Sequence, residues 1–198
     1  MGETAMTERQ PEQKNREFYE WLRTVVCVVV ATILLFTFLV RIVRVDGESM
    51  RETLQDQDIL LVLADPLCGT YRSGDIVVLS KETFKGGAPI VKRVVATEGQ
   101  TVDIDFSAGI VYVDGEVLEE EYIREPTWTP EGLEFPVTIP GNHVFVLGDN
   151  RNNSSDSRHI DLGPIDERMM MGKAVFLAIP GKTADLDARE WSRIGLIG

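Results

Sequence analysis

A serine in a tight polar turn and a lysine in an apolar run are the residues of this chain best suited to chemistry. Ser49 lies in VDGESMRETL, two residues after Gly47, where a glycine lets the backbone turn tightly and another chain approach closely. Lys92 lies in PIVKRVVAT, directly after Val91. A lysine held against apolar side chains has its charged form disfavoured, which lowers its pKa and makes it a usable general base. The two residue types predict a nucleophile and its base.

Both residues also have structural interpretations that the sequence leaves open. Ser49 followed by Glu52 fits a capping box at the start of a short helix. Lys92 could lie on an edge strand, where lysines prevent pairing with other chains. Strand alternation puts Lys92 and Arg93 on opposite faces, so one of the two is expected to point inward.

A third polar motif, GDNRNNSSDSR, runs from Gly148 to Arg158 directly after the apolar run HVFVL. It holds more Asp, Asn, Ser and Arg than a plain turn needs. A calcium loop starting at Asp149 is excluded, because its sixth position is Ser154 rather than glycine and its twelfth is Ile160 rather than a bidentate glutamate.

Histidine offers a different base. His159 and Asp161 follow the polar motif, so a Ser–His–Asp triad stays open as an alternative to the lysine. A zinc site is not predicted, because the histidines and cysteines have no recognised ligand spacing.

The segment before Ser49 predicts where the chemistry takes place. Residues 24–40, TVVCVVVATILLFTFLV, carry no charge and would span about 26 Å as a helix at ~1.5 Å per residue. They show no polar face, and no A-x-A cleavage pattern follows, so we predict an uncleaved membrane anchor. The short link from Val40 to Ser49 reaches about 30 Å at most. The chemistry is therefore expected to act on something presented at the membrane surface, although the basic flanks leave the orientation open.

Composition limits the remaining classes. The 198 residues include 20 Lys and Arg against 32 Asp and Glu, for a net charge of −12, so nucleic acid is not expected as a partner. Cys27 lies in the apolar segment and Cys68 outside it, so no disulfide between them is expected. Stability must come from a core, and residues 41–198 are enough to build one.

The chain after residue 41 has the pattern of a β protein. Asp114-Gly115 between apolar runs predicts a type I′ hairpin, and residues 119–141 are acidic and proline-rich, which predicts an irregular excursion at the edge of the sheet. Few helical patterns are present, so we predict a mainly β fold with an antiparallel, barrel-like sheet. The predicted strands, all short, rich in Val and Ile and bounded by Gly, Pro or Asp, are 58–65, 74–80, 89–97, 101–105, 110–118, 143–149 and 173–181.

Taken in order, these segments resemble the type I signal peptidases, membrane-anchored serine proteases with a Ser–Lys dyad. After the anchor, the resemblance is carried by VDGESMRETL, GDIVVL, VKRVVATEGQTV and GDNRNNSSDSR, and by the closing WSRIGLIG. It covers nearly all of the chain after residue 20. It implies a cytoplasmic tail at 1–23, a single transmembrane helix at 24–40 and an extracytoplasmic catalytic β domain at 41–198, with a small insert at about 103–142. It also implies a location in the cytoplasmic membrane of a bacterium.

The resemblance implies a role for each candidate residue. Ser49 would be the nucleophile and Lys92 its general base, with Ser154 orienting the lysine ammonium. The loop would be held against this dyad by Asp149, Asp156 and Arg158. The oxyanion hole would include the Ser49 amide. Some members add a serine hydroxyl at the position two residues before the nucleophile, where this chain has Gly47. Shallow apolar pockets for small residues at positions −1 and −3 of the substrate would be lined by Val43, Val45 and Val91.

The implied activity is endoproteolysis of secreted preproteins after an Ala-x-Ala site, with no metal or organic cofactor. The implied partners are signal peptides and the lipid bilayer, with the secretion translocon as a further candidate. Two departures support an alternative, a catalytically impaired β domain that binds preproteins or translocation partners. Glu52 replaces the family's usual proline, which could loosen the turn, and Glu48 would raise the pKa of Lys92. A Ser–Lys self-cleaving regulator is disfavoured, because those proteins carry a DNA-binding module whereas this chain has a membrane span and an acidic body.

Overall fold

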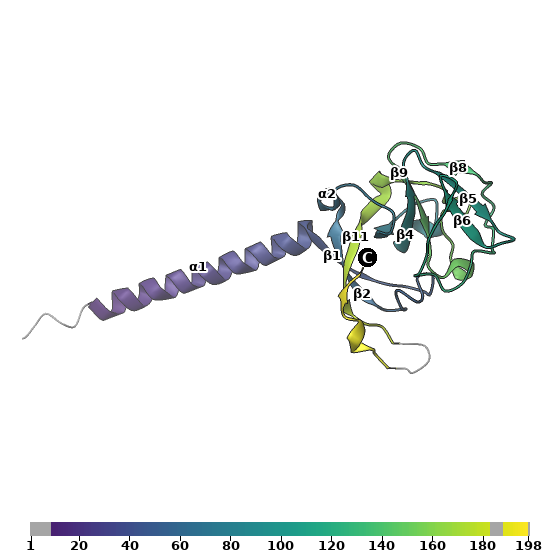
Figure 1. The fold of residues 1–198 in the computed structure, drawn as a ribbon. Helices are drawn as coiled ribbons and strands as arrows, with labels where there is room; N and C mark the ends of the chain where they lie inside the picture. The colour runs from purple at the N-terminus through teal and green to yellow at the C-terminus, as the bar shows by residue number, and fades with distance from the viewer. Residues whose placement is uncertain (1–8, 183–187, 198) are drawn as a thin grey trace, which may run out of the picture. The chain divides into compact units, whose positions relative to one another are not determined.

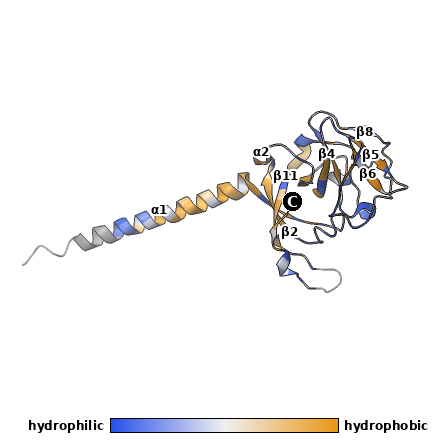
Figure 2. Cartoon of the chain, in the orientation of Figure 1, coloured by the Kyte–Doolittle hydropathy of each residue, from blue (hydrophilic) through white to orange (hydrophobic). Residues whose placement is uncertain are grey.

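The first of two units contains one long helix. A computed structural model describes residues 9–182 and 188–197, and the chain divides into Met1–Val40 and Arg41–Gly198. Helix α1 runs from Arg9 to Phe38, and its apolar part is evident in Figure 2. Within the described residues one helical segment, Asn15–Phe38, is long and apolar enough to cross a membrane, with a mean hydropathy of 2.2. Length and composition therefore suit this helix to a membrane span.

The second unit is built from two antiparallel sheets (Figure 1). The larger sheet has the strand order β1 (Val40–Arg44), β2 (Ile59–Ala64), β11 (Met170–Ile179), β3 (Ile76–Leu79), β4 (Ile90–Thr97), β9 (His143–Leu147) and β10 (Ile165–Asp166), with β12 (Gly195–Leu196) beside β11. The smaller sheet has the order β7 (Glu116–Val117), β6 (Ile110–Val113), β5 (Thr101–Asp105) and β8 (Val137–Thr138). Helix α2 (Asp65–Cys68) and four 3₁₀ turns, at Lys85–Gly87, Arg151–Asn153, Glu167–Met169 and Trp191–Arg193, complete the described elements. The predicted mainly β, antiparallel fold is confirmed.

The predicted strands agree with the burial of their residues in the structure. Strand β2 alternates half-buried and buried residues, as a strand with one face on the core should. The hairpin between β6 and β7 turns at Asp114 and Gly115, whose φ angles of 54° and 83° are both positive, as a type I′ turn requires. Strands β8, β10 and β12 were not predicted, because two residues are too few to show a period. Strand β1 was also not predicted; it begins at Val40, the last residue of the uncharged run assigned to the anchor.

Strand β4 is an interior strand of the larger sheet and is buried on both faces. Apolar clusters lie against each face, one containing Val91 and another containing Val94. Both charged residues of the strand are therefore buried, with Lys92 1% and Arg93 5% exposed. The sequence predicted an inward position for one of the two; the structure buries both, because apolar clusters cover both faces of the strand. An edge position for Lys92 is likewise excluded, since β4 pairs with β3 and with β9.

Candidate active site

The residues around Ser49 form consecutive turns. Arg51 N donates to Glu48 O at 3.0 Å and Leu54 N to Met50 O at 2.8 Å, and no helix follows within residues 49–54. The Met50 and Leu54 side chains are fully buried and fix the turn to the core. The capping box is therefore not formed, and the Ser49 hydroxyl is free to take another partner.

That partner is Lys92. Its Nζ atom donates a hydrogen bond to Ser49 Oγ at 2.5 Å, although the two residues are 43 positions apart in the chain. Lys92 is paired with Val77 of β3, and the preceding residue, Val91, is 8% exposed. The nucleophile and base predicted from residue types are thus in direct contact in a water-poor setting.

Burial lowers the pKa of Lys92 to about 8, because the ammonium has lost its hydration. The charge of Lys85 acts in the same direction, whereas Asp156, Glu131 and Asp149 favour the ammonium and raise the pKa. The result is an amine that can lose its proton near neutral pH, as a general base must.

The two glutamates of the serine turn differ in their local settings. The Glu48 carboxylate lies 3.6 Å from Arg51 Nη1, and the charges acting most strongly on Lys92 come from other residues. Glu52 has a φ of 92°, a conformation that proline, locked near −65°, cannot adopt. The turn therefore has a local backbone path that differs from one built on proline.

Glycine at position 52 is expected to stabilise the protein. A side chain at positive φ costs roughly 1–2 kcal/mol, and Glu52→Gly removes that strain. Glycine also raises the conformational entropy of the unfolded chain, which offsets part of this gain, so the free energy of unfolding should increase by up to about 1 kcal/mol. Glu52→Pro should destabilise by about 3 kcal/mol or more, since the ring cannot reach this φ. Thermal unfolding of the detergent-solubilised protein measures both. Glu82→Gly, at an exposed residue with ordinary φ, is the matched control and should lower the midpoint. A lower midpoint for Glu52→Gly would contradict the strain.

Asp149 ties the polar loop to both β4 and the serine turn. Its carboxylate is fully buried and accepts hydrogen bonds from Arg93 Nε at 2.9 Å and Nη2 at 2.8 Å. Thr53 Oγ1 donates to the same carboxylate at 2.5 Å. Arg93 was not predicted as a site residue, although a charge inside an apolar strand directly after Lys92 was a usable signal.

A second buried ion pair lies beneath the loop. Arg158 and Asp156 are both fully buried and are joined by bonds of 2.8 Å from Nε and from Nη2. Burial alone would raise the pKa of the Asp156 carboxyl, but the hydrogen bonds and charge of Arg158 hold it below its usual value. Asp156 also accepts from Gly148 N at 2.9 Å. The Asp156 carboxylate thus stays ionised near Lys92, where its charge offsets part of the decrease in the pKa of Lys92 that burial causes.

Ser154 lies beside the dyad with a different hydrogen-bond partner from the one predicted. Its hydroxyl donates to Asp156 Oδ2 at 2.8 Å, and within the described residues it forms no hydrogen bond with Lys92. The loop nevertheless docks on the serine turn, because Asn150 N donates to Ser49 O at 3.0 Å. Ser154 is therefore placed to act on Lys92 through Asp156.

The two predicted oxyanion-hole positions differ in their availability. Gly47 N donates to Asp56 Oδ1 at 2.9 Å and is already occupied. The Ser49 amide has no hydrogen-bond acceptor in the described part of the chain. The Ser49 amide is thus the donor that a developing oxyanion could meet.

The three valines predicted to line pockets share one apolar cluster. Val45 is 4% and Val91 8% exposed, and the half-buried Val43 packs against the same cluster, which also contains Met50. Apolar surface therefore lies directly beside the serine turn. The histidine alternative fails, since His159 contacts Phe84 and Asp161 rather than Ser49.

The acidic segment after residue 118 is pinned to the polar loop by a buried ion pair. Arg151 Nη1 donates to Glu120 Oε2 at 2.7 Å, and Nη2 bonds the other carboxylate oxygen. The Asn152 side chain accepts from Trp128 N at 2.9 Å and Thr129 N at 3.1 Å. This segment is thus part of the site's supporting structure, which its composition did not indicate.

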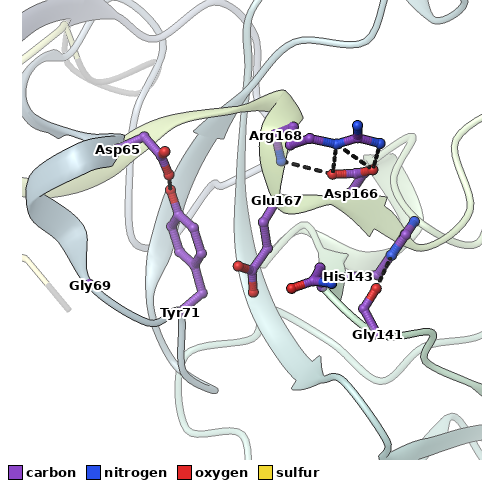
Figure 3. Close-up of a pocket in the computed structure, with 9 residues that line it drawn as sticks. Asp65, Gly69, Tyr71, Gly141, His143, Asp166, Glu167 and Arg168 are labelled. Carbon is purple, nitrogen blue, oxygen red and sulfur yellow. Dashed lines mark hydrogen bonds and ion pairs between the residues drawn. The ribbon is translucent and has the colours of Figure 1, made fainter.

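A separate pocket of about 640 Å³ contains none of the predicted site residues (Figure 3). Tyr71 Oη donates to Asp65 Oδ1 at 2.5 Å on one side of it, and Arg168 pairs with Asp166 on the other. Its polar groups are largely satisfied by each other.

Comparisons with known proteins identify the family of the chain. The family model described as "Signal peptidase, peptidase S26" matches residues 18–179. A Bacillus licheniformis protein named "Signal peptidase I" is 32% identical, over 88% of this chain and 96% of the relative. "Signal peptidase I T" of Bacillus subtilis (strain 168) is 34% identical, over 88% of this chain and 92% of the relative. With a matching family model over most of its length and relatives above 30% identity, the chain belongs to the signal peptidase family, peptidase S26.

Proposed function

We propose that this signal peptidase removes signal peptides from secreted preproteins, cutting after Ala-x-Ala sites with Ser49 as the nucleophile and Lys92 as the general base. The observation that carries the proposal is the 2.5 Å hydrogen bond from Lys92 Nζ to Ser49 Oγ. It places a buried amine, whose pKa is lowered to about 8, on the hydroxyl it would deprotonate. The family and the relatives named above support the same activity.

The chemistry follows from the groups in contact. Neutral Lys92 takes the proton of Ser49 as Oγ attacks the scissile carbonyl, and the Ser49 amide faces the developing oxyanion. Lys92 then passes the proton to the leaving amine of the mature chain, and an acyl-enzyme remains. A water gives its proton to Lys92 while attacking the ester, and Lys92 returns that proton to Ser49 Oγ as the signal peptide leaves, which restores both residues. No metal or organic cofactor takes part in these steps.

Substrate would bind as an added strand beside the segment that leads to Ser49. Val43, Val45 and Val91 would then meet the side chains at positions −1 and −3. Val45 and Val91 are almost fully buried and Val43 is half-buried, so the apolar surface they would offer is small, which suits alanine and glycine.

Helix α1 would hold the catalytic domain at the extracytoplasmic face of a bacterial cytoplasmic membrane. Signal peptides and lipids would be its partners there, with the translocon as a further candidate. Because both enzyme and substrate would be confined to one bilayer, their encounter would be effectively intramolecular.

Cleavage of a preprotein by the detergent-solubilised full chain tests this function. Wild type should cut an Ala-x-Ala substrate after the −1 alanine and should fail on the same substrate with tryptophan at −1. Ser49→Ala should be inactive on both while still binding the signal peptide. If folded wild type binds but never cuts, the impaired binding domain is the correct interpretation.

Activity is expected to rise with pH through an apparent pKa of about 8. Only the neutral amine is a base, so below this value protonation of Lys92 removes it, and at pH 7 roughly one tenth of the molecules hold a neutral lysine. The dependence of kcat/KM on pH, measured from about pH 6 to 10, reports this group in the free enzyme. A profile that is flat between pH 6 and 8 would exclude Lys92 as the base.

A further inference from the structure

A cleft of about 400 Å³ opens directly beside the nucleophile. It is lined by the serine turn, by Lys85 from the β3–β4 connection, and by residues of the acidic segment and the polar loop. None of its lining residues is apolar; they are Asp46, Gly47, Glu48, Ser49, Lys85, Thr129, Glu131, Asn152, Asn153, Ser154 and Ser155. The composition is that of a site for a hydrated, polar chain rather than for a signal peptide's small apolar residues.

The apolar surface next to Ser49 does not extend into this cleft. Val43, Val45 and Val91 belong to the apolar cluster under the serine turn and line no part of the cleft. A substrate bound across Ser49 therefore meets apolar surface with one of its parts and polar surface with another. A preprotein has the same division at its cleavage site, with small apolar residues before the bond and the mature chain after it.

The acidic segment and the polar loop, which both line the cleft, are held together by hydrogen bonds. Glu131 Oε2 accepts from Asp156 N at 3.0 Å, and Arg158 Nη1 donates to Thr129 O at 2.9 Å. Thr129 is also bonded to the Asn152 side chain, through its amide and through Oγ1 at 3.1 Å each. A wall fixed in this way can discriminate between side chains, because it does not need to be ordered when substrate binds.

The charges of the cleft are unequal. Asp46, Glu48 and Glu131 contribute carboxylates, against the single ammonium of Lys85. Glu131 and Lys85 both act on Lys92, in opposite directions, so both lie within electrostatic range of the reaction. Opposite charges separated by several ångströms near a protein surface interact by roughly 1 kcal/mol, or about fivefold in rate.

On the basis of the proposed cleavage reaction, we propose that this cleft binds the first residues of the mature chain and selects against acidic side chains there. Glu131 and Lys85 are the residues that set the preference. The excess of carboxylates repels Asp and Glu just after the scissile bond and favours lysine, arginine and neutral polar residues.

Three peptides that share one Ala-x-Ala site test this selectivity, with Lys, Gln or Glu at the first two mature positions. Wild type should cut the Lys peptide about fivefold faster than the Glu peptide in kcat/KM, and 1 M salt should remove most of the difference by screening. Glu131→Gln keeps the oxygen that accepts from Asp156 N and should lower the Lys-to-Glu ratio about threefold. Lys85→Gln should raise the ratio by a similar factor. Glu134→Gln, at an exposed carboxylate that does not line the cleft, should leave it unchanged.

The ratio separates the inference from the cleavage reaction itself. Any change that acts only through the pKa of Lys92 alters all three rates equally and leaves the ratio as it was. Equal cleavage of the three peptides by wild type, or ratios unmoved by Glu131→Gln and Lys85→Gln, would overturn the subsite while the proposed function stands. Failure to cut any peptide at alanine would instead overturn the proposed function.

Discussion

Lys92→Met is expected to lower kcat/KM for an Ala-x-Ala preprotein by about 10⁴-fold or more, because the proposed general base is lost and Ser49 keeps its proton. Methionine has nearly the length of the lysine stem and fills the same buried space, so the fold should survive. Lys81→Met is the matched control. Its Nζ atom donates to Asp161 O and Leu162 O and has no contact with Ser49, so activity should stay near that of wild type.

The same substitution should leave the protein at least as stable as wild type near pH 7. Lys92 has a folded pKa of about 8 against 10.5 for an ordinary lysine, so its charged form is less favourable in the folded state. Below pH 8 this penalty is fully present, on the order of 3 kcal/mol, and it is relieved as pH rises from 8 to 10.5.

Thermal unfolding at pH 7 and at about pH 10 measures this effect. The advantage of Lys92→Met over wild type should shrink as the pH rises, since the folded lysine loses its proton above pH 8 and no longer holds a buried charge. Activity within tenfold of wild type would show that another group is the base. A large loss of stability at pH 7 would show that the Lys92 ammonium stabilises the domain rather than destabilising it.

Gly148→Ala is expected to lower kcat/KM by about 10²-fold or more, the loss that follows when a reacting group is displaced by about 1 Å. A Cβ atom at Gly148 would lie 2.1 Å from Ser154 Oγ and 2.5 Å from Ser49 O, far inside van der Waals contact. The second of these atoms is backbone, so the loop and the serine turn must separate. The φ of Gly148 lies outside the left-handed region, so the effect comes from this contact and not from backbone strain.

Overpacking at this position should also destabilise the protein by about 1–3 kcal/mol. Kinetics and thermal unfolding of Gly148→Ala are best compared with Gly195→Ala, where the added methyl meets nothing within 4 Å. The control should keep both activity and stability. Wild-type kinetics in Gly148→Ala would mean that the loop can move away from Ser49 without affecting the dyad.

The sequence was sufficient for the parts of this protein that depend on local patterns. Short apolar runs predicted the strands, and Asp114-Gly115 predicted its hairpin, since backbone preferences and side-chain alternation act between near neighbours. The uncharged run from residue 24 to 40 predicted a long helix for the same reason. Residue types and motif order also led to the signal peptidase family.

Tertiary structure decided the features that depend on contacts between residues far apart in the sequence. Only the packing of β4 inside the sheet buries both Lys92 and Arg93, because a strand's own sequence does not reveal whether its second face is covered. The use of the Gly47 amide by Asp56 and the positive φ of Glu52 likewise arise from the path of the folded turn. The acidic segment lines the cleft through contacts over long separations, among them the bond from Arg151 to Glu120, 31 residues away, and the bond from Arg158 to Thr129 O, 29 residues away. Contacts over such separations depend on how whole elements pack, and no local period in the chain encodes them.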